Sequence, residues 1–396
     1  MDTHVNPYKC KEFIVILQHK GKCVFLHILY AYMRKAIILA AAAIAVFASC
    51  RTNTLPPRPT IPLVESIARD TSGLATLVAR AGDSGANGSI AIIGEPAEAV
   101  ALTRLFLGMD AADNIDGRAV RDSLPDFAGE QFDAILDVMA SPFGHFVPQM
   151  IDSLREAAVQ GAMFAWDSTF HKSVNGRVVL PKSRAKILVF SSPLQSKYGL
   201  FDVDTLQQLC SGKSKLLSPV ATTIADAVGA GAENIAVWAS RELRASQAYE
   251  EAFAASGASG SLVSITPESA FDIRTSLRSL LRQYSASGKR LDAIILSEYN
   301  VDKTPLLSEI SLIRSAGTEE DQAFSHMLSP NLLILDPGTS LTRAVYRYMR
   351  ANNLFTHRIA LPSVRWFETS EYDSGESVIT EVGSAYVHSA YVPDFD

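Results

Sequence analysis

The sequence predicts an α/β protein of two Rossmann-like lobes, each a mostly parallel sheet with helices on both faces, joined by a hinge. Short, nearly continuous apolar runs alternate along the chain with segments of helical spacing. The alternation occurs in two series, which indicates two lobes. The chain has 396 residues, 47% of them hydrophobic, and this is enough for two sizeable cores.

The first part of the chain has the features of a targeting signal and not those of a folded domain. Residues 1–32 have apolar patches without a globular pattern, and we expect them to be an upstream extension, with translation starting at Met33. Residues 33–50 have the basic start and apolar run of a signal peptide, and their end, FASC, resembles the lipobox of bacterial lipoproteins. The resemblance implies lipidation of Cys50. An uncleaved anchor is the alternative, and both place the body outside the cytoplasm, in the bacterial cell envelope and facing the periplasm.

The body follows in four predicted parts. Residues 51–86 should form a Pro-rich tether and a leading helix. The first lobe, over 87–215, contains the predicted strands SIAIIG, FDAILDV, AMFAWDS and AKILVFSS. The second lobe, over 216–350, repeats the scheme with ENIAVWAS, SLVSITP, LDAIILSEYN and NLLILDPG, and a long insertion precedes the last of these strands. Residues 351–396 form a C-terminal return segment with some period-two alternation.

Composition and motifs limit the partners and cofactors. A net charge of −6 without a long basic block makes nucleic acid an unsuitable partner. The four cysteines form no C-x-x-C pair and no His cluster has zinc spacing, so we expect no metal. There is no Walker A loop, Rossmann fingerprint or G-x-S-x-G elbow, and we expect no cofactor.

The block 232–296 resembles the second lobe of type I periplasmic binding proteins, chiefly through AENIAVWAS, SQAYEEAFAASG and the leucine-spaced helix before DAIIL. The earlier block around FDAILDVMASPFGHF looks like the matching unit of the first lobe. The resemblance implies a small polar ligand, an amino acid or a peptide-like molecule, bound in a cleft that closes between the lobes.

Polar residues after the predicted strands are the candidate ligand contacts. Hydroxyl and charged groups there could hold a carboxylate or an amine, but serine and threonine in such places also cap helices, and an aspartate also closes turns. A solvated or packed loop is likewise the alternative for the charged and aromatic groups. The candidates are Ser141, Asp167, Ser168, Thr169, Ser240, Arg241, Ser297, Glu298 and Tyr299.

A second resemblance concerns aspartate and glutamate racemases, which the second half is similar to in AVWASRELRASQAYEEAF, LDAIILSEYNVDKTPLL and LLILDPGTSLTRAV. That family implies two facing cysteines that exchange the α-proton of an amino acid. Here Ser297 takes the matching position, and AKILVFSS ends without a cysteine. A serine hydroxyl alone is too weak a base for this proton.

Three hypotheses follow from these patterns. The first is a lipid-anchored binding protein for a small polar ligand, without catalysis. The second is an envelope module of the same fold that binds a protein partner through the long insertion, which we expect to be a long ordered loop. The third is an enzyme of altered racemase type.

Overall fold

The computed structural model describes residues 58–391, apart from 72, 115, 144–150, 174–177, 268–271, 300–301, 316, 357 and 372–376. The predicted signal peptide, Met33, Cys50 and the first part of the tether lie outside the described residues. The segment Thr54–Asp396 forms one compact unit. In the described part of this unit, no helix is both long and apolar enough to cross a membrane.

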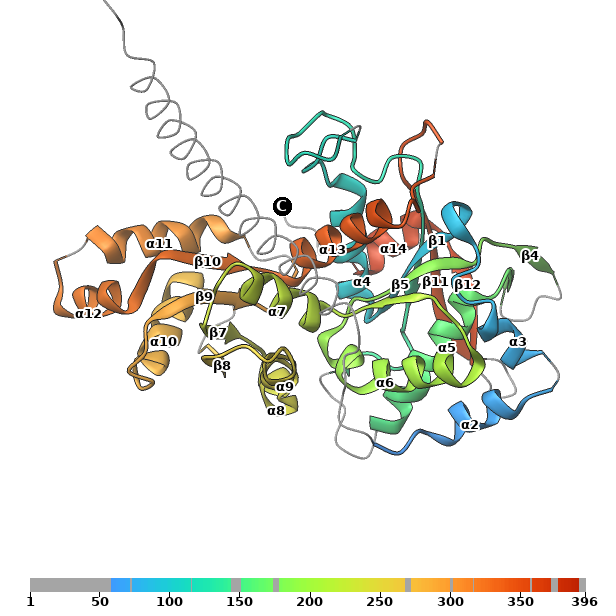
Figure 1. Cartoon of the computed structure of the whole chain (residues 1–396), viewed down its shortest axis with the longest axis horizontal. Coiled ribbons are helices and arrows are strands. Elements are labelled where there is room, and N and C mark those ends of the chain that lie inside the picture. The colour runs from blue at the N-terminus through green and yellow to red at the C-terminus, as the bar shows by residue number, and fades with distance from the viewer. Residues whose placement is uncertain are drawn as a thin grey trace, which may run out of the picture. The chain divides into compact units, whose positions relative to one another are not determined.

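Two sheets organise this unit (Figure 1). The larger sheet has the strand order β4-β3-β12-β11-β2-β1-β5-β6, and its neighbours from β11 to β6 pair in parallel. These strands are β1 (Ser89–Gly94), β2 (Gln131–Leu136), β3 (Thr169–His171), β4 (Val179–Pro181), β5 (Ala185–Phe190), β6 (Lys215–Leu217), β11 (Ser363–Glu371) and β12 (Ser377–Val382).

The smaller sheet is parallel throughout, with the order β10-β9-β7-β8. Its strands are β7 (Asn234–Trp238), β8 (Ser261–Ile265), β9 (Leu291–Leu296) and β10 (Leu328–Leu335). Because β1, β5, β7 and β9 are nearly continuous apolar runs, both of their faces can be buried under helices. The prediction of a two-lobed α/β fold with parallel sheets is confirmed.

Helices cover both faces of each sheet. On the larger sheet, one face packs against α4 (Pro96–Gly108), α13 (Pro337–Ala351) and α14 (Ser384–Tyr391), and the other against α2 (Pro62–Arg69), α3 (Leu74–Ala79), α5 (Ile151–Trp166) and α6 (Pro193–Cys210). On the smaller sheet, α7 (Pro219–Gly229), α8 (Arg241–Ser246) and α9 (Ala248–Ala255) lie opposite α10 (Ile273–Ser285), α11 (Lys303–Ser315) and α12 (Glu319–Met327). A short 3₁₀ turn, Gly85–Asn87, precedes β1.

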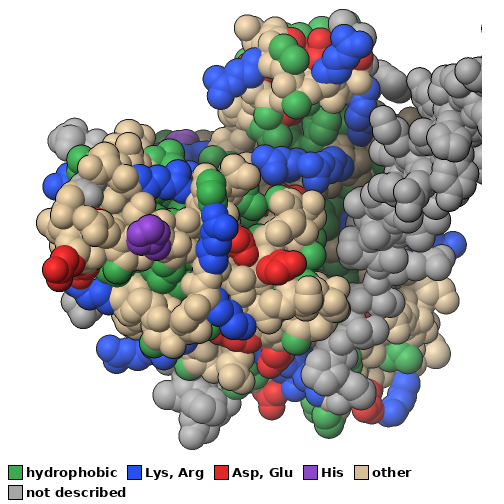
Figure 2. All heavy atoms as spheres, turned by 60° about the vertical axis from the view of Figure 1, so that its left-hand side comes forward, with side chains coloured by type: hydrophobic (Ala, Val, Ile, Leu, Met, Phe, Trp, Pro, Cys, Tyr) green, Lys and Arg blue, Asp and Glu red, His purple; other side chains and the backbone are tan. Residues whose placement is uncertain are grey.

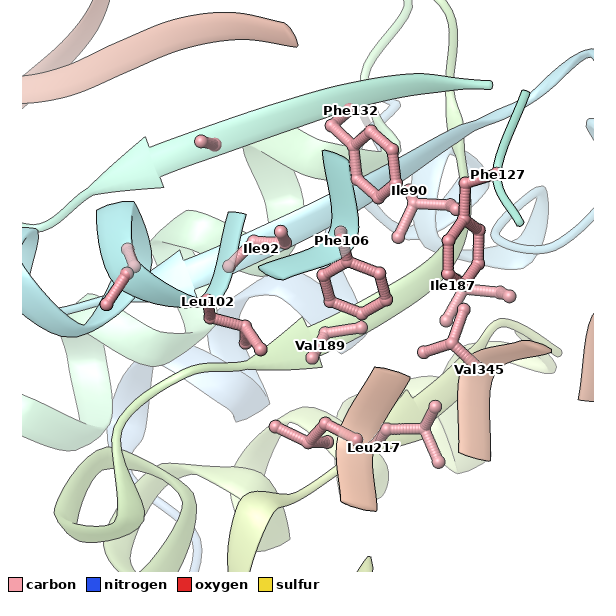
Figure 3. Close-up of a cluster of buried hydrophobic side chains, with 14 of the residues drawn as sticks. Ile90, Ile92, Leu102, Phe106, Phe127, Phe132, Ile187, Val189, Leu217 and Val345 are labelled. Atoms are coloured by element: carbon pink, nitrogen blue, oxygen red, sulfur yellow. The ribbon is translucent and has the colours of Figure 1, made fainter. Parts of the chain in front are cut away.

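Alternate residues of β1, β2 and β5 form the core beneath α4 and α13. Figure 3 shows this cluster, in which Phe106 of α4 lies near Phe127 and Phe132, at ring-centroid distances of 5.1 and 5.2 Å. Val345 of α13 belongs to the same cluster. The helix that follows the last strand of the smaller sheet therefore packs on the core of the larger one.

Helix starts are set by local chemistry. Proline stands in the first turn of α4, α6, α7 and α13, where its fixed φ suits the helix and its missing N–H needs no partner. The N-cap side chains of Ser192, Ser218 and Asp336 accept backbone N–H groups of the turns that follow. Each of these caps lies directly after a strand or one residue beyond it, so each helix begins near the carboxyl edge of a sheet.

Two element predictions are wrong. AMFAWDS is not a strand, because Ala162, Ala165 and Trp166 continue the buried helical stripe of α5. The long insertion is not a loop, because Leu306, Ile310 and Ile313 recur at helical spacing and pack α11 against the sheet.

The face that Figure 2 shows carries Lys and Arg side chains as well as Asp and Glu side chains. This distribution agrees with the formal net charge of −6.

Candidate functional site

Acidic residues follow strands of both sheets at their carboxyl edges. Glu95 comes after β1, Asp137 after β2, Glu298 follows β9 by two residues and Asp336 comes after β10. Together with three neighbours on the adjoining helices and loops, they form what we call the strand-end cluster: Glu95, Glu98, Asp137, Tyr249, Glu298, Tyr299 and Asp336. Carboxyl edges are where open α/β sheets bind their ligands.

Asp137 is buried and held in place by three donors. Its Oδ1 accepts the Ala140 N–H at 3.2 Å and the Thr369 hydroxyl at 3.4 Å, and its Oδ2 accepts Nε2 of Gln195 at 3.3 Å. Burial and the charge of Glu95 raise the pKa of Asp137 to about 6, against the opposing effect of the donors. Asp137 is therefore mostly ionised at neutral pH, yet basic enough to accept a proton.

Glu98 lies in the first turn of α4, beside the same Glu95. Burial, followed by the charges of Glu95 and Glu298, raises the pKa of Glu98 to about 8, although a hydrogen bond with Ser192 opposes the shift. Its Oε2 is shielded from solvent and has no hydrogen-bond partner among the described residues. Glu98 is therefore mostly a neutral carboxylic acid at neutral pH.

The smaller sheet contributes two buried tyrosines. Tyr249 of α9 is 1% exposed, and its hydroxyl has no hydrogen-bond partner in the described part of the chain. Burial and the charges of Glu98 and Asp336 raise the pKa of Tyr249, which places its hydroxyl within electrostatic range of both. Tyr299 is 8% exposed, and its hydroxyl donates to the backbone oxygen of Ser191 at the end of β5.

Asp336 caps a helix and forms an ion pair within the cluster. Its Oδ1 accepts the Thr339 N–H at 2.7 Å and so caps α13. Its Oδ2 accepts the Thr339 hydroxyl at 2.8 Å and forms an ion pair with Lys303 at the start of α11. The cluster therefore joins elements of both sheets.

The arrangement suits acid–base chemistry. Two carboxyl groups near one anionic neighbour have pKa values on either side of 7, so one is a base and the other an acid at the same pH. Orphaned buried polar atoms add groups that a bound molecule could satisfy: Glu98 Oε2, Gln195 Oε1 and the Tyr249 hydroxyl. No set of three or more His, Cys, Asp and Glu side chains in the described ranges is arranged to hold a metal ion.

The structure places the sequence-predicted ligand residues in different parts of the fold. Ser141 lies at the cluster, where its hydroxyl donates to Glu95 Oε1 at 3.3 Å. Ser297 is buried, Glu298 is exposed and Tyr299 is packed in the core beneath α4. Ser240 caps α8 by accepting the Leu243 N–H at 3.2 Å, and Arg241 is exposed in the first turn of that helix. The capping alternative thus describes the Ser240 contact.

Asp167, Ser168 and Thr169 lie elsewhere, because the segment before them is the helix α5 and not a strand. Asp167 Oδ1 accepts the N–H groups of Ser168 and Thr169, which closes a turn into β3. Asp167 and Thr169, with His171, line a mostly apolar cavity of about 450 Å³ between α2, α3, α5, β3 and β12. None of the strand-end cluster residues lines this cavity.

Sequence reasoning missed Glu95, Glu98, Asp137, Tyr249 and Asp336. A signal for three of them was present, because AIIGE, AILD and LLILD each place an acid at or just after the end of an apolar strand. Glu98 and Tyr249 had no such signal, since both stand on helices whose position over the strand ends follows only from the tertiary fold.

Comparisons with known proteins give structural matches only. No family model matches the chain, and no curated protein matches it. Among solved structures, it is similar to glutamate racemase from Bacillus anthracis (14% identity, TM-score 0.46, 73% of this chain and 91% of that one). Glutamate racemase from Francisella tularensis, in complex with D-glutamate, is 12% identical with a TM-score of 0.46, over 73% of this chain and 91% of that one. An aspartate racemase homologue from Pyrococcus horikoshii is 10% identical with a TM-score of 0.42, over 66% of this chain and 99% of that one.

These matches correct the main functional interpretation. The sequence predicts a binding protein of the type I periplasmic class without catalysis, and that prediction is wrong, since the similar structures are glutamate and aspartate racemases. Of the two resemblances drawn from the sequence, the racemase one is shared with the structural neighbours.

Proposed function

We propose that the protein is an acid–base enzyme that moves protons on a small substrate at the strand-end cluster. The observation that supports this most is the pair of carboxyl groups of buried Asp137 and half-buried Glu98, with pKa values raised to about 6 and about 8. Perturbed carboxyl groups that gather at strand ends are typical of catalytic sites.

In the proposed reaction, ionised Asp137 takes a proton from a substrate carbon next to a carbonyl or carboxyl group. Neutral Glu98 gives its own proton to the substrate, so that the enzyme finishes with Asp137 protonated and Glu98 ionised. Exchange with water, or the reverse reaction, restores the starting state. Tyr249, whose raised pKa keeps its hydroxyl neutral, can donate a hydrogen bond to the oxygen on which negative charge develops.

Inversion at a carbon centre, the activity named for the racemase structures, belongs to this class of reaction. A carboxylate can replace a thiolate as base when its pKa is raised toward the working pH. In this chain, Asp137 and Glu98 would take over the proton transfer that Ser297 cannot perform.

The experiment is solvent exchange in ²H₂O. The full-length protein is incubated with a panel of D- and L-amino acids and 2-hydroxy acids, and ¹H NMR follows loss of the α-proton signal. At least one compound should exchange, and Asp137→Asn and Glu98→Gln should each lower its rate by about 100-fold or more. Absence of exchange across the panel, or exchange that both variants retain, would contradict the proposal.

We also propose that Cys50 carries a lipid that attaches the body to a membrane of the cell envelope. The support is the FASC sequence after a basic start and an apolar run of residues 36–48. The Pro-rich residues that follow would then separate the body from the bilayer.

A further inference from the structure

The strand-end cluster has more acidic groups than cationic partners. Lys303 forms an ion pair with Asp336, whereas no ion pair reaches Glu95, Glu98, Asp137 or Glu298 within the described residues. Uncompensated carboxyl groups that lie together repel one another, which costs stability unless something else balances their charge.

The cluster extends from the surface into the interior. Glu298 is exposed and Glu95 is half-buried, whereas Asp137 is 3% exposed and Tyr249 is 1% exposed. Charge–charge interactions are therefore stronger at Asp137 than at Glu298, because buried surroundings screen charges less.

Unsatisfied polar atoms lie at the inner end. Gln195 is fully buried, donates from Nε2 to Asp137, and leaves Oε1 without a partner among the described residues. Glu98 Oε2 and the Tyr249 hydroxyl also have no hydrogen-bond partner among the described residues. An amide oxygen can only accept a hydrogen bond, so it calls for an N–H or O–H donor.

An ammonium or guanidinium group offers several hydrogen-bond donors and a positive charge. It could therefore satisfy the unpaired amide oxygen and also balance the excess of acidic groups. A second carboxylate would bring only acceptors, which cannot satisfy Gln195 Oε1, and would be repelled by ionised Asp137. We propose that the cluster binds a cationic small molecule, a basic amino acid, in preference to a dicarboxylic one. The inference rests on the residues of the proposed function and specifies the class of substrate that they take.

Ligand binding to the full-length protein tests this directly. Isothermal titration would compare putrescine, L-ornithine and L-lysine with L-glutamate, and with 1,4-butanediol as the uncharged match for putrescine. We expect binding of the cations, none of the diol or L-glutamate, and weaker binding at high salt.

Variants locate the site. Glu298→Gln and Glu95→Gln should each weaken cation binding about tenfold, since each removes a charged partner of the ligand. Glu233→Gln is the matched control, because Glu233 is an exposed glutamate just before β7, at the opposite edge of the smaller sheet, and it should leave affinity unchanged. Binding of L-glutamate instead of the cations, absence of cation binding, or equal affinity in all variants would overturn the inference.

This result is separable from that of the exchange experiment. Cation binding without α-proton exchange would support the ligand class and contradict the acid–base function. Exchange of the α-proton of a dicarboxylic compound, without cation binding, would support the acid–base function and contradict the ligand class.

Discussion

At the scale of one residue, Glu98 lowers the stability of the folded protein at the pH values at which its carboxyl ionises. In the unfolded chain its carboxyl ionises at the ordinary value of 4.5, whereas in the folded protein burial raises its pKa to about 8. The folded state therefore holds the proton more tightly, and the stability that this contributes is present below pH 4.5 and is lost as pH rises to about 8.

Glu98→Gln should therefore stabilise the protein in alkaline solution while it lowers exchange activity. Glutamine keeps the shape of the neutral acid and cannot ionise, so we expect the free energy of unfolding at pH 9 to rise by about 1–3 kcal/mol, with little change at pH 4. Urea unfolding at both pH values measures it. Glu65→Gln, at an exposed residue of α2, is the control. An equal effect of Glu98→Gln at pH 4 and pH 9 would show that folding does not raise the pKa of the Glu98 carboxyl.

Among the elements, the loop after β9 links the two sheets. Tyr299 packs in the core beneath α4 and bonds to the Ser191 backbone, so Tyr299→Ala should lower the free energy of unfolding by about 3 kcal/mol. Exposed Glu298 is the neighbouring control, and Glu298→Gln should change stability by less than about 0.5 kcal/mol. If Tyr299→Ala unfolds at the same urea concentration as the wild type, the contact between the sheets is not formed in solution.

The cap of α8 gives a second test at this scale. Because Ser240 accepts the Leu243 N–H, Ser240→Ala should lower stability by about 1 kcal/mol, whereas exposed Arg241→Ala should be nearly neutral. Thermal unfolding of both variants decides between a cap and a residue reserved for a ligand. A stable Ser240→Ala variant would speak for the latter.

For the molecule as a whole, the sequence predicted the parallel strands well because buried strands such as Ile90–Ile93 and Ala293–Leu296 are continuous apolar runs. It failed for AMFAWDS, where a helix buried on one side has the same short apolar run as a strand. It also could not show that β11 returns to pair with β2, because that pairing joins residues far apart in the chain.

The candidate site was predicted less well for a related reason. Strand ends predicted Ser141, Glu298 and Tyr299, whereas the acids at the ends of three other strands, Glu95, Asp137 and Asp336, were not predicted. Burial is what turns Asp137 and Glu98 into an acid–base pair, and burial depends on the packing of both sheets.

Attachment to the envelope is tested on the full chain. Cys50→Ala should move the protein from the membrane fraction to the soluble fraction, or leave it with an uncleaved signal, because acyl chains on Cys50 would supply stable attachment. Fractionation and gel migration measure this. A variant that behaves as the wild type in both assays would refute lipidation at Cys50.

Two carboxyl groups of the strand-end cluster, those of Asp137 and Glu98, should hold opposite protonation states at neutral pH. NMR titration of protein labelled with ¹³C in its Asp and Glu carboxyl groups measures this without a substrate, with Asp137→Asn and Glu98→Gln used for assignment. We predict apparent pKa values of about 6 and about 8 for the signals lost in Asp137→Asn and Glu98→Gln, respectively. Titration of both groups below pH 5, as for ordinary exposed carboxyl groups, would contradict it.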